Sequence, residues 1–141
     1  MRYVLDSSVA LKWVLPEPDS AKALLLRADF QAGAHELLAP DIFPVEVAHA
    51  LARAERRNLL AVGQASPLLA AVMLTAPHFH PYQPLLGRAL SIASPARIGV
   101  YDCLYVALAE RESCEFVTAD DRLVRNLLAR FPFIVSLASM P

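Results

Sequence analysis

Residues 99–122, GVYDCLYVALAERESCEFVTADDR, carry two acidic residues whose positions indicate the fold. Asp102 lies at the start of a segment in which apolar residues recur with helical spacing, so we expect a helix with one buried face and with Asp102 turned away from it. Asp120 follows a short apolar run, residues 115–118, which predicts a strand that ends in a polar turn. One carboxylate is thus expected in the first turns of a helix and the other just beyond the carboxyl end of a strand, where open α/β sheets bind ligands.

Two further acids occupy comparable positions. Asp6 ends the first apolar run, residues 3–5, just as Asp120 ends a later one. Glu46 falls in the first turn of a predicted helix that has Pro44 near its start. Because a glutamate in a first turn also interacts favourably with the helix dipole, Glu46 is open to a structural as well as a functional role.

Predicted strands and helices alternate along the whole chain, which indicates a three-layer α/β/α fold with a parallel sheet covered by helices on both faces. Residues 21–30 are expected to form one of these helices, with Leu24, Leu25 and Ala28 facing inward. Residues 61–76 are expected to form another, ended by a proline. No repeat, low-complexity tract or linker interrupts the pattern, so residues 1–141 are expected to form a single domain.

The carboxyl ends of parallel strands meet at one edge of a sheet, so Asp6, Glu46, Asp102 and Asp120 are expected to approach one another. Carboxylates about 5 Å apart repel by roughly 3 kcal/mol at an effective dielectric near 20, which calls for a compensating cation. Mg²⁺ or Mn²⁺, held by one or two carboxylates together with waters and phosphate oxygens, suits such a site. An ion of this kind activates water for attack on a phosphate, so the pattern predicts metal-dependent phosphodiester chemistry.

Composition restricts the possible settings and partners. Hydrophobic residues make up 56% of the chain and charged residues 19%, so some of the apolar surplus is expected to face a partner. No apolar run approaches the length of a membrane span, and Asp6 comes too early for a signal-peptide core, so we expect a cytoplasmic protein. Cys103 and Cys114 lack the spacing of a zinc site and are expected to be reduced thiols.

The net charge of −1 argues at first against a nucleic-acid partner. If a metal neutralises four of the 14 acids, however, the remaining 10 face 13 basic residues, a balance of +3. Eleven of these basic residues are arginine, whose planar fork suits phosphate.

Three blocks of the sequence resemble the motifs of the PIN-domain ribonucleases, and most of all the VapC-type toxins of bacterial toxin-antitoxin pairs. The blocks are LDSSVALKWVLPEP at residues 5–18, PDIFPVEVAHAL at 40–51 and YDCLYVALAERESCEFVTADDRL at 101–123. The resemblance implies a five-stranded parallel sheet between helices, cleavage of RNA with Mg²⁺ or Mn²⁺, a homodimer, and a cognate antitoxin that masks the site. We expect the antitoxin to dock an apolar segment near residues 61–76 and to direct a basic side chain toward the acids.

The resemblance also implies a role for each residue of the site. Asp6 and Asp102 would be the strongest metal ligands, Glu46 a ligand or a positioner of the attacking water, and Asp120 a ligand of a second metal or of the outer shell. Ser7 and Thr118 resemble polar residues whose hydroxyl groups line the family's pocket.

Other classes of protein fit the sequence less well. The pair Glu46-x-x-His49 is half of a di-iron helix motif, but the second pair is absent. A receiver domain would want a second acid after the first strand, and a haloacid-type phosphatase would want Asp-x-Asp, whereas Asp6 is followed by two serines. The alternatives left open are a binding protein of the same fold with weak or absent nuclease activity, and a nuclease that cuts single-stranded DNA.

Overall fold

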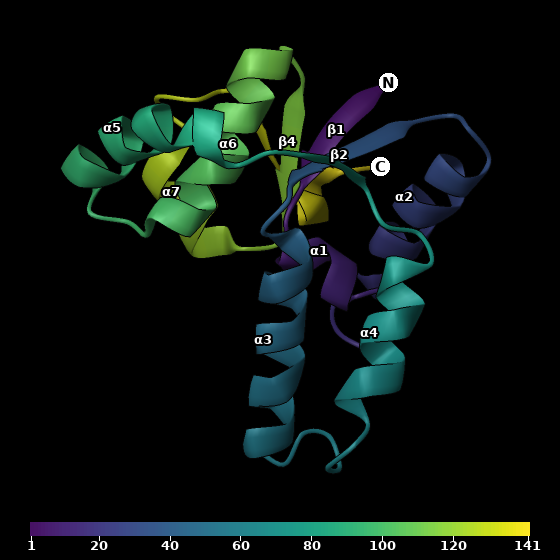
Figure 1. Ribbon diagram of the computed structural model, residues 1–141. Coiled ribbons are helices and arrows are strands. Elements are labelled where there is room, and N and C mark those ends of the chain that lie inside the picture. Colours follow the sequence, from purple (N-terminus) through teal and green to yellow (C-terminus); the bar gives the residue numbers. More distant parts are fainter.

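The core of the protein is a parallel five-stranded sheet, seen in a computed structural model of residues 1–141 (Figure 1). The strand order is β3-β2-β1-β4-β5, and every neighbouring pair is parallel. This confirms the expected α/β architecture with five strands. The strands are β1 (Arg2–Leu5), β2 (Glu36–Pro40), β3 (His78–His80), β4 (Glu115–Thr118) and β5 (Ile134–Ser136).

Seven α-helices cover the two faces of the sheet. Figure 1 shows α5, α6 and α7 on one side of the sheet and α2 on the other, as right-handed crossovers between parallel strands require, whereas α3 and α4 extend away from the sheet. Two short 3₁₀ helices, η1 (Gln83–Leu85) and η2 (Leu137–Ser139), complete the chain. The α-helices are α1 (Ser7–Leu11), α2 (Ser20–Gln31), α3 (Phe43–Arg56), α4 (Ala65–Met73), α5 (Leu86–Ala96), α6 (Val100–Glu112) and α7 (Asp121–Leu127).

The topology creates one crevice at the carboxyl edge of the sheet. The chain moves from β1 outward through β2 to β3, then crosses back to β4 and continues outward to β5. The connections after β1 and after β4 therefore leave in opposite directions, and the gap between these two central strands is the position at which such sheets bind ligands. Asp6 follows β1 and Asp120 follows β4, so both acids stand at this point.

Helix α6 differs from the expected one-faced helix, because residues 103–109 are all buried. The helix packs against α5 on one side and against β1, β2 and β4 on the other, so no face of its middle part reaches water. Only the ends are accessible, and Asp102 is half-buried in the first turn. No helix of the structure is long and apolar enough to span a membrane.

The prediction that Leu24, Leu25 and Ala28 form the inward face of α2 is wrong. Ala23 and Leu26 are buried, whereas Leu24 and Leu25 are exposed. The orientation of the helix is fixed by the Trp13 indole, which donates a hydrogen bond of 2.9 Å to the carbonyl of Ala23. Apolar residues follow one another without interruption from Ala23 to Leu26, so the sequence does not reveal which of them meet this tryptophan.

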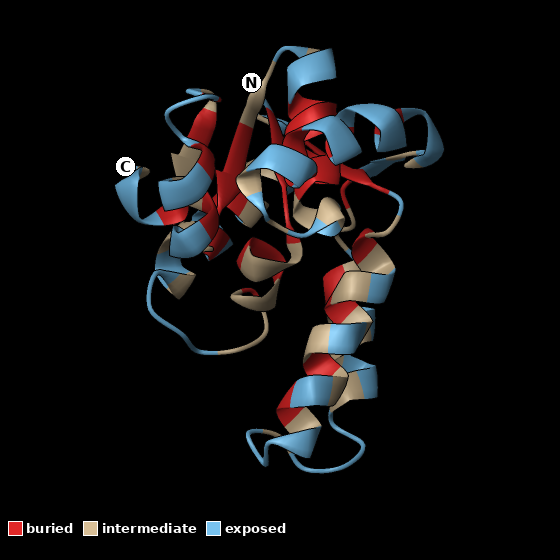
Figure 2. Ribbon diagram, turned by 90° about the vertical axis from the view of Figure 1, so that its left-hand side faces the viewer, coloured by how far each residue is buried: buried red, intermediate tan, exposed pale blue.

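Helices α3 and α4 form a hairpin, residues 43–73, that projects away from the sheet and that we call the α3–α4 arm (Figure 2). Residues such as Val47 and Leu51 are buried along its inner seam, and much of the remainder is exposed. Helix α4 is shorter than the expected 61–76 because Gly63 takes a left-handed conformation (φ 94°) in the turn before it. Leu59 and Val62 are exposed in the turn at the tip of the arm, and Leu74 is exposed just after the end of α4.

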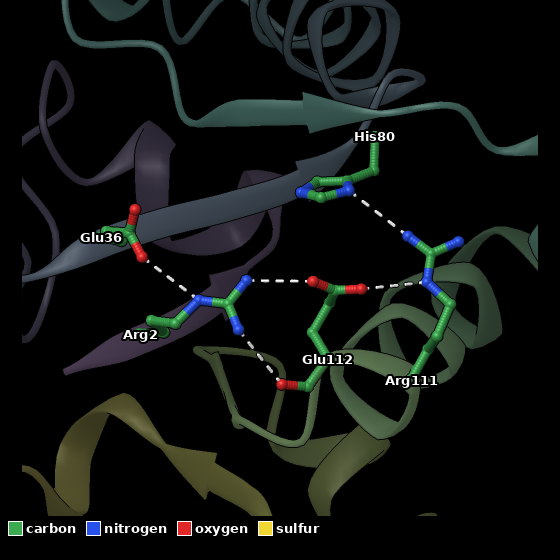
Figure 3. Close-up of polar contacts among 5 residues, drawn as sticks. All are labelled: Arg2, Glu36, His80, Arg111 and Glu112. Carbon is green, nitrogen blue, oxygen red and sulfur yellow. Dashed lines mark hydrogen bonds and ion pairs between the residues drawn. The ribbon is translucent and has the colours of Figure 1, made fainter.

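A polar network ties the amino end of the sheet to the end of α6 (Figure 3). Glu112 accepts hydrogen bonds from Arg2 (2.9 Å) and from Arg111 (3.1 Å). Arg2 also pairs with Glu36 at 3.2 Å, and Arg111 lies 3.3 Å from the Nδ1 atom of His80. The arginines of this end of the molecule are therefore engaged by protein partners.

Candidate functional site

Asp6 is the most buried of the candidate acids, with 6% of its surface exposed. It occupies the N-cap position of α1, and its Oδ2 atom accepts a hydrogen bond of 2.6 Å from the Thr118 hydroxyl. Its Oδ1 atom accepts another from the Ser8 hydroxyl. The pKa of Asp6 is raised to about 7, chiefly by burial and to a smaller extent by the charges of Asp102 and Glu46, against the opposing effect of these two hydrogen bonds.

The two hydroxyl groups that hold Asp6 also join β1 to β4. The Ser8 hydroxyl accepts a hydrogen bond of 2.9 Å from the backbone N–H of Ala119. The Thr118 hydroxyl accepts one of 3.1 Å from the backbone N–H of Asp120. Sequence reasoning selected Ser7 and Thr118 as pocket-lining residues and missed Ser8, because the sequence alone does not reveal which of two serines in a first helical turn points back to the aspartate. Ser7 instead faces the groove beside Glu46.

Glu46 is positioned by α3 on one side and by α6 on the other. Its Oε1 atom accepts a hydrogen bond of 2.6 Å from the hydroxyl of Tyr105, whose side chain is fully buried. Burial raises the pKa of Glu46 above its usual value, the hydrogen bond from Tyr105 opposes this, and the charge of Asp102 adds to it. The sequence analysis missed Tyr105, although its spacing of three residues from Asp102 in a predicted helix offered a signal.

Asp102 and Asp120 share a pocket of about 180 Å³. Burial raises the pKa of Asp102, the charge of Asp120 raises it further, and the charge of Arg122 opposes both. Asp120 is also the N-cap of α7, where its Oδ1 atom accepts hydrogen bonds from the backbone N–H groups of Arg122 (3.0 Å) and Leu123 (3.2 Å). Its second carboxylate oxygen remains free for another partner.

A second hollow, of about 480 Å³, adjoins Glu46. Its lining includes Glu46, His49 and Arg53 from α3, together with the exposed Tyr101 from α6. We call it the α3 groove. The four acids thus lie at one edge of the sheet, with Asp102 and Asp120 in one pocket and Glu46 in the groove.

The four acids do not converge on one point, since no three His, Cys, Asp or Glu side chains are placed to hold a common metal ion. The donor set nevertheless fits Mg²⁺ or Mn²⁺, because these hard ions take carboxylate oxygens and Mg²⁺ usually needs only one or two, with waters completing the shell. No arginine or lysine forms an ion pair with any of the four acids. Hydrogen bonds to Asp6 and Glu46 and the charge of Arg122 near Asp102 offset their repulsion only in part.

Tyr105→Phe is expected to lower the activity of this site by about 10- to 100-fold, the range typical of partners that orient a metal-site ligand. The variant removes only the hydroxyl that holds Glu46. Tyr3→Phe is the matched control, because it removes another buried tyrosine hydroxyl, one that contacts only the sulfur of Met1. Comparison of turnover rates at equal folded fraction checks this, and equal rates for the two variants would contradict the role of Tyr105.

Comparison with known proteins gives a consistent set of similarities. Residues 3–126 match the model of the family described as PIN domain. The chain is 35% identical over 138 residues to ribonuclease VapC3 of Pyrobaculum aerophilum, an alignment that covers 96% of this chain and 99% of the relative. It is 30% identical over 132 residues to ribonuclease VapC9 of Mycobacterium tuberculosis, covering 94% and 96% respectively.

Two solved structures share the fold. The crystal structure of PAE2754 from Pyrobaculum aerophilum has a TM-score of 0.70 at 21% identity and covers 99% of this chain and 94% of that one. VapBC2 from Rickettsia felis, solved with a DNA fragment from its promoter, has a TM-score of 0.63 at 15% identity, with coverage of 96% and 97%. At these identities the likeness concerns the fold alone.

Proposed function

This chain belongs to the PIN-domain family, and from that membership we propose that it is a metal-dependent endoribonuclease, the toxin of a VapC-type toxin-antitoxin pair. In this proposal residues 1–141 are a single PIN-like domain, the substrate is RNA, and the activity is cytoplasmic. Relatives named as ribonucleases that align over nearly their full length support it.

The observation that carries the proposal is the group of carboxylates without ion-pair partners at the crevice between β1 and β4. Burial raises the pKa values of Asp6, Glu46 and Asp102, and none of these acids has a basic partner. A protein that held these groups only for stability would be expected to pair or solvate them. Perturbed carboxylates in a cleft are typical of a functional site.

Each acid has a distinct part in the proposed reaction. Asp6 and Asp102 would be the principal ligands of Mg²⁺ or Mn²⁺, with Asp120 beside Asp102, and the bound ion would supply an activated water and stabilise charge on the phosphate. A carboxylate has about four lone-pair sites, so Asp6 can bind a cation while it accepts the hydrogen bonds from Ser8 and Thr118. Glu46 has Oε1 held by the tyrosine hydroxyl, which leaves Oε2 free to orient the attacking water.

The test is incubation of the purified protein with total cellular RNA in the presence of Mg²⁺, Mn²⁺ or EDTA. We expect fragments with either metal and none with EDTA. Single-stranded DNA, treated in parallel, is expected to remain intact. Cleavage of DNA but not RNA would favour the DNA nuclease, and no cleavage of either by folded protein that binds metal would favour the binding protein.

The proposed antitoxin docks along the α3–α4 arm, where Leu59, Val62 and Leu74 are exposed, and directs a basic side chain to the acids. Exposed apolar side chains that lie close together are typical of a surface that binds a partner. A structure of the complex tests this, and a partner that leaves the acids open to solvent would contradict it.

The proposed homodimer is tested by sedimentation of the isolated protein, and a monomer at micromolar concentration would contradict it.

A further inference from the structure

Arg97 follows α5 with a backbone conformation that arginine rarely adopts. Its φ of 56° lies in the left-handed region, where residues with a Cβ are strained and glycine is usual at the end of a helix. Elsewhere the chain uses glycine for such positions, at Gly33 and Gly63, or the short polar residues Asp19, Asn58 and Ser113. Strain of this kind is often retained at functional sites, which indicates a functional role for the Arg97 side chain.

The Arg97 side chain lines the pocket that contains Asp102 and Asp120, together with Arg122 and Asn126. The pocket volume of about 180 Å³ is more than ten times the ~10–15 Å³ that a single water needs. Two guanidinium groups and a carboxamide therefore surround a space large enough for a ligand.

Neither guanidinium group of this pocket has a protein partner, since no ion pair or side-chain hydrogen bond joins Arg97 or Arg122 to another residue. This contrasts with Arg2 and Arg111, which are paired at the opposite edge of the sheet (Figure 3), and with Arg88, which binds Glu110 through two hydrogen bonds of 2.8 and 3.0 Å. Both arginines that line the pocket of Asp102 and Asp120 are thus free of protein partners.

We propose that Arg97, Arg122 and Asn126 form a subsite for a backbone phosphate of the RNA strand, next to the phosphate that is cleaved. The planar fork of arginine binds phosphate through two parallel hydrogen bonds, and the Asn126 amide can donate a third. Because the subsite shares its pocket with two of the acids, a phosphate bound there holds the neighbouring phosphodiester at the acids. The inference rests on the proposed function and names the residues that position its substrate.

The decisive variant is Arg97→Gly, which removes the side chain and relieves the strained backbone together. Its matched control is Ser113→Gly, because Ser113 ends α6 in the same left-handed region (φ 53°). Ser113 lies at the far end of α6, about 16 Å along the helix from Asp102. Both variants are expected to raise the melting temperature by about 2–4 °C, since both remove the same kind of strain.

Only Arg97→Gly is expected to impair RNA binding. The probe is short single-stranded RNA of random sequence, bound with Mg²⁺ present in an Asp102→Asn background that prevents cleavage. We expect about tenfold weaker binding, and a decrease of about 0.7 in the slope of log K against log salt, the value for one lost phosphate contact on a single strand. Arg97→Lys keeps the charge without the fork and is expected to give a smaller loss.

The possible outcomes separate this inference from the proposed function. If the parent protein cleaves RNA and Arg97→Gly binds RNA with unchanged affinity and salt slope, the subsite is wrong and the nuclease remains. If both glycine variants lose affinity equally, the effect comes from the backbone and the subsite is also wrong. If the parent neither binds nor cleaves RNA, the proposed function fails and the subsite fails with it.

Discussion

Asp102→Asn is expected to reduce the rate of RNA cleavage by about a thousandfold or more while the protein stays folded. The substitution keeps the size of the side chain but removes the charge that would hold the metal ion. Metal ions contribute several kcal/mol of transition-state stabilisation, and each 1.36 kcal/mol corresponds to a tenfold change in rate. Asp102 makes no hydrogen bond within the protein and is repelled by Asp120, so the free energy of unfolding should stay the same or rise.

Asp121→Asn is the matched control for this variant. Asp121 is the exposed neighbour of Asp120 and undergoes the same chemical change outside the pocket. The rate at which the Asp121→Asn variant cleaves RNA is expected to stay near that of the parent protein. Parental activity in Asp102→Asn, measured on folded protein, would place the reaction elsewhere.

Without metal, the protein is expected to lose stability as the pH rises. The Asp6 carboxyl has a pKa of 3.8 in the unfolded chain and about 7 in the folded protein, so between these values the folded state binds more protons. The free energy of unfolding therefore falls across this range, by up to about 4 kcal/mol from Asp6 alone at 1.36 kcal/mol per pKa unit. Glu46 and Asp102 contribute in the same direction, because burial raises their pKa values too.

Urea unfolding in EDTA at a series of pH values from about 4 to 8 measures this effect. Asp6→Asn should flatten the dependence, because it removes the group whose pKa changes most. Added Mn²⁺ should stabilise the protein more at about pH 8 than at about pH 6, since the ion binds the ionised carboxylates. Greater stability of the metal-free protein at high pH would show that Asp6 is not the buried, uncompensated acid described here.

The sequence is sufficient to predict the parallel sheet and to place the four acids at its carboxyl edge. Asp6 and Asp120 each end an apolar run, and the alternation of strands and helices implies parallel pairing, so their placement at one edge follows from topology. Glu46 and Asp102 were found by the same reasoning from helix starts. That these four residues act as metal ligands stays a prediction, which the placement supports.

The details that the sequence does not reveal depend on tertiary contacts. Tyr105 sits among apolar core residues of α6, and only packing against α3 shows that its hydroxyl meets Glu46. Likewise, the choice between Ser7 and Ser8 depends on the exact direction of the first turn of α1. The strained backbone of Arg97 has no signature in the sequence at all, because φ is set by how α5 joins α6.

The most direct test of the central claim is anomalous diffraction from crystals of the protein soaked in Mn²⁺. The account predicts a peak at the carboxyl edge between β1 and β4, within about 2.0–2.3 Å of a carboxylate oxygen of Asp6 or Asp102. The peak should be absent from Asp102→Asn crystals soaked in the same way. A peak elsewhere, such as at His78 and His80, or none at the acids under saturating Mn²⁺, would contradict the assignment of the site.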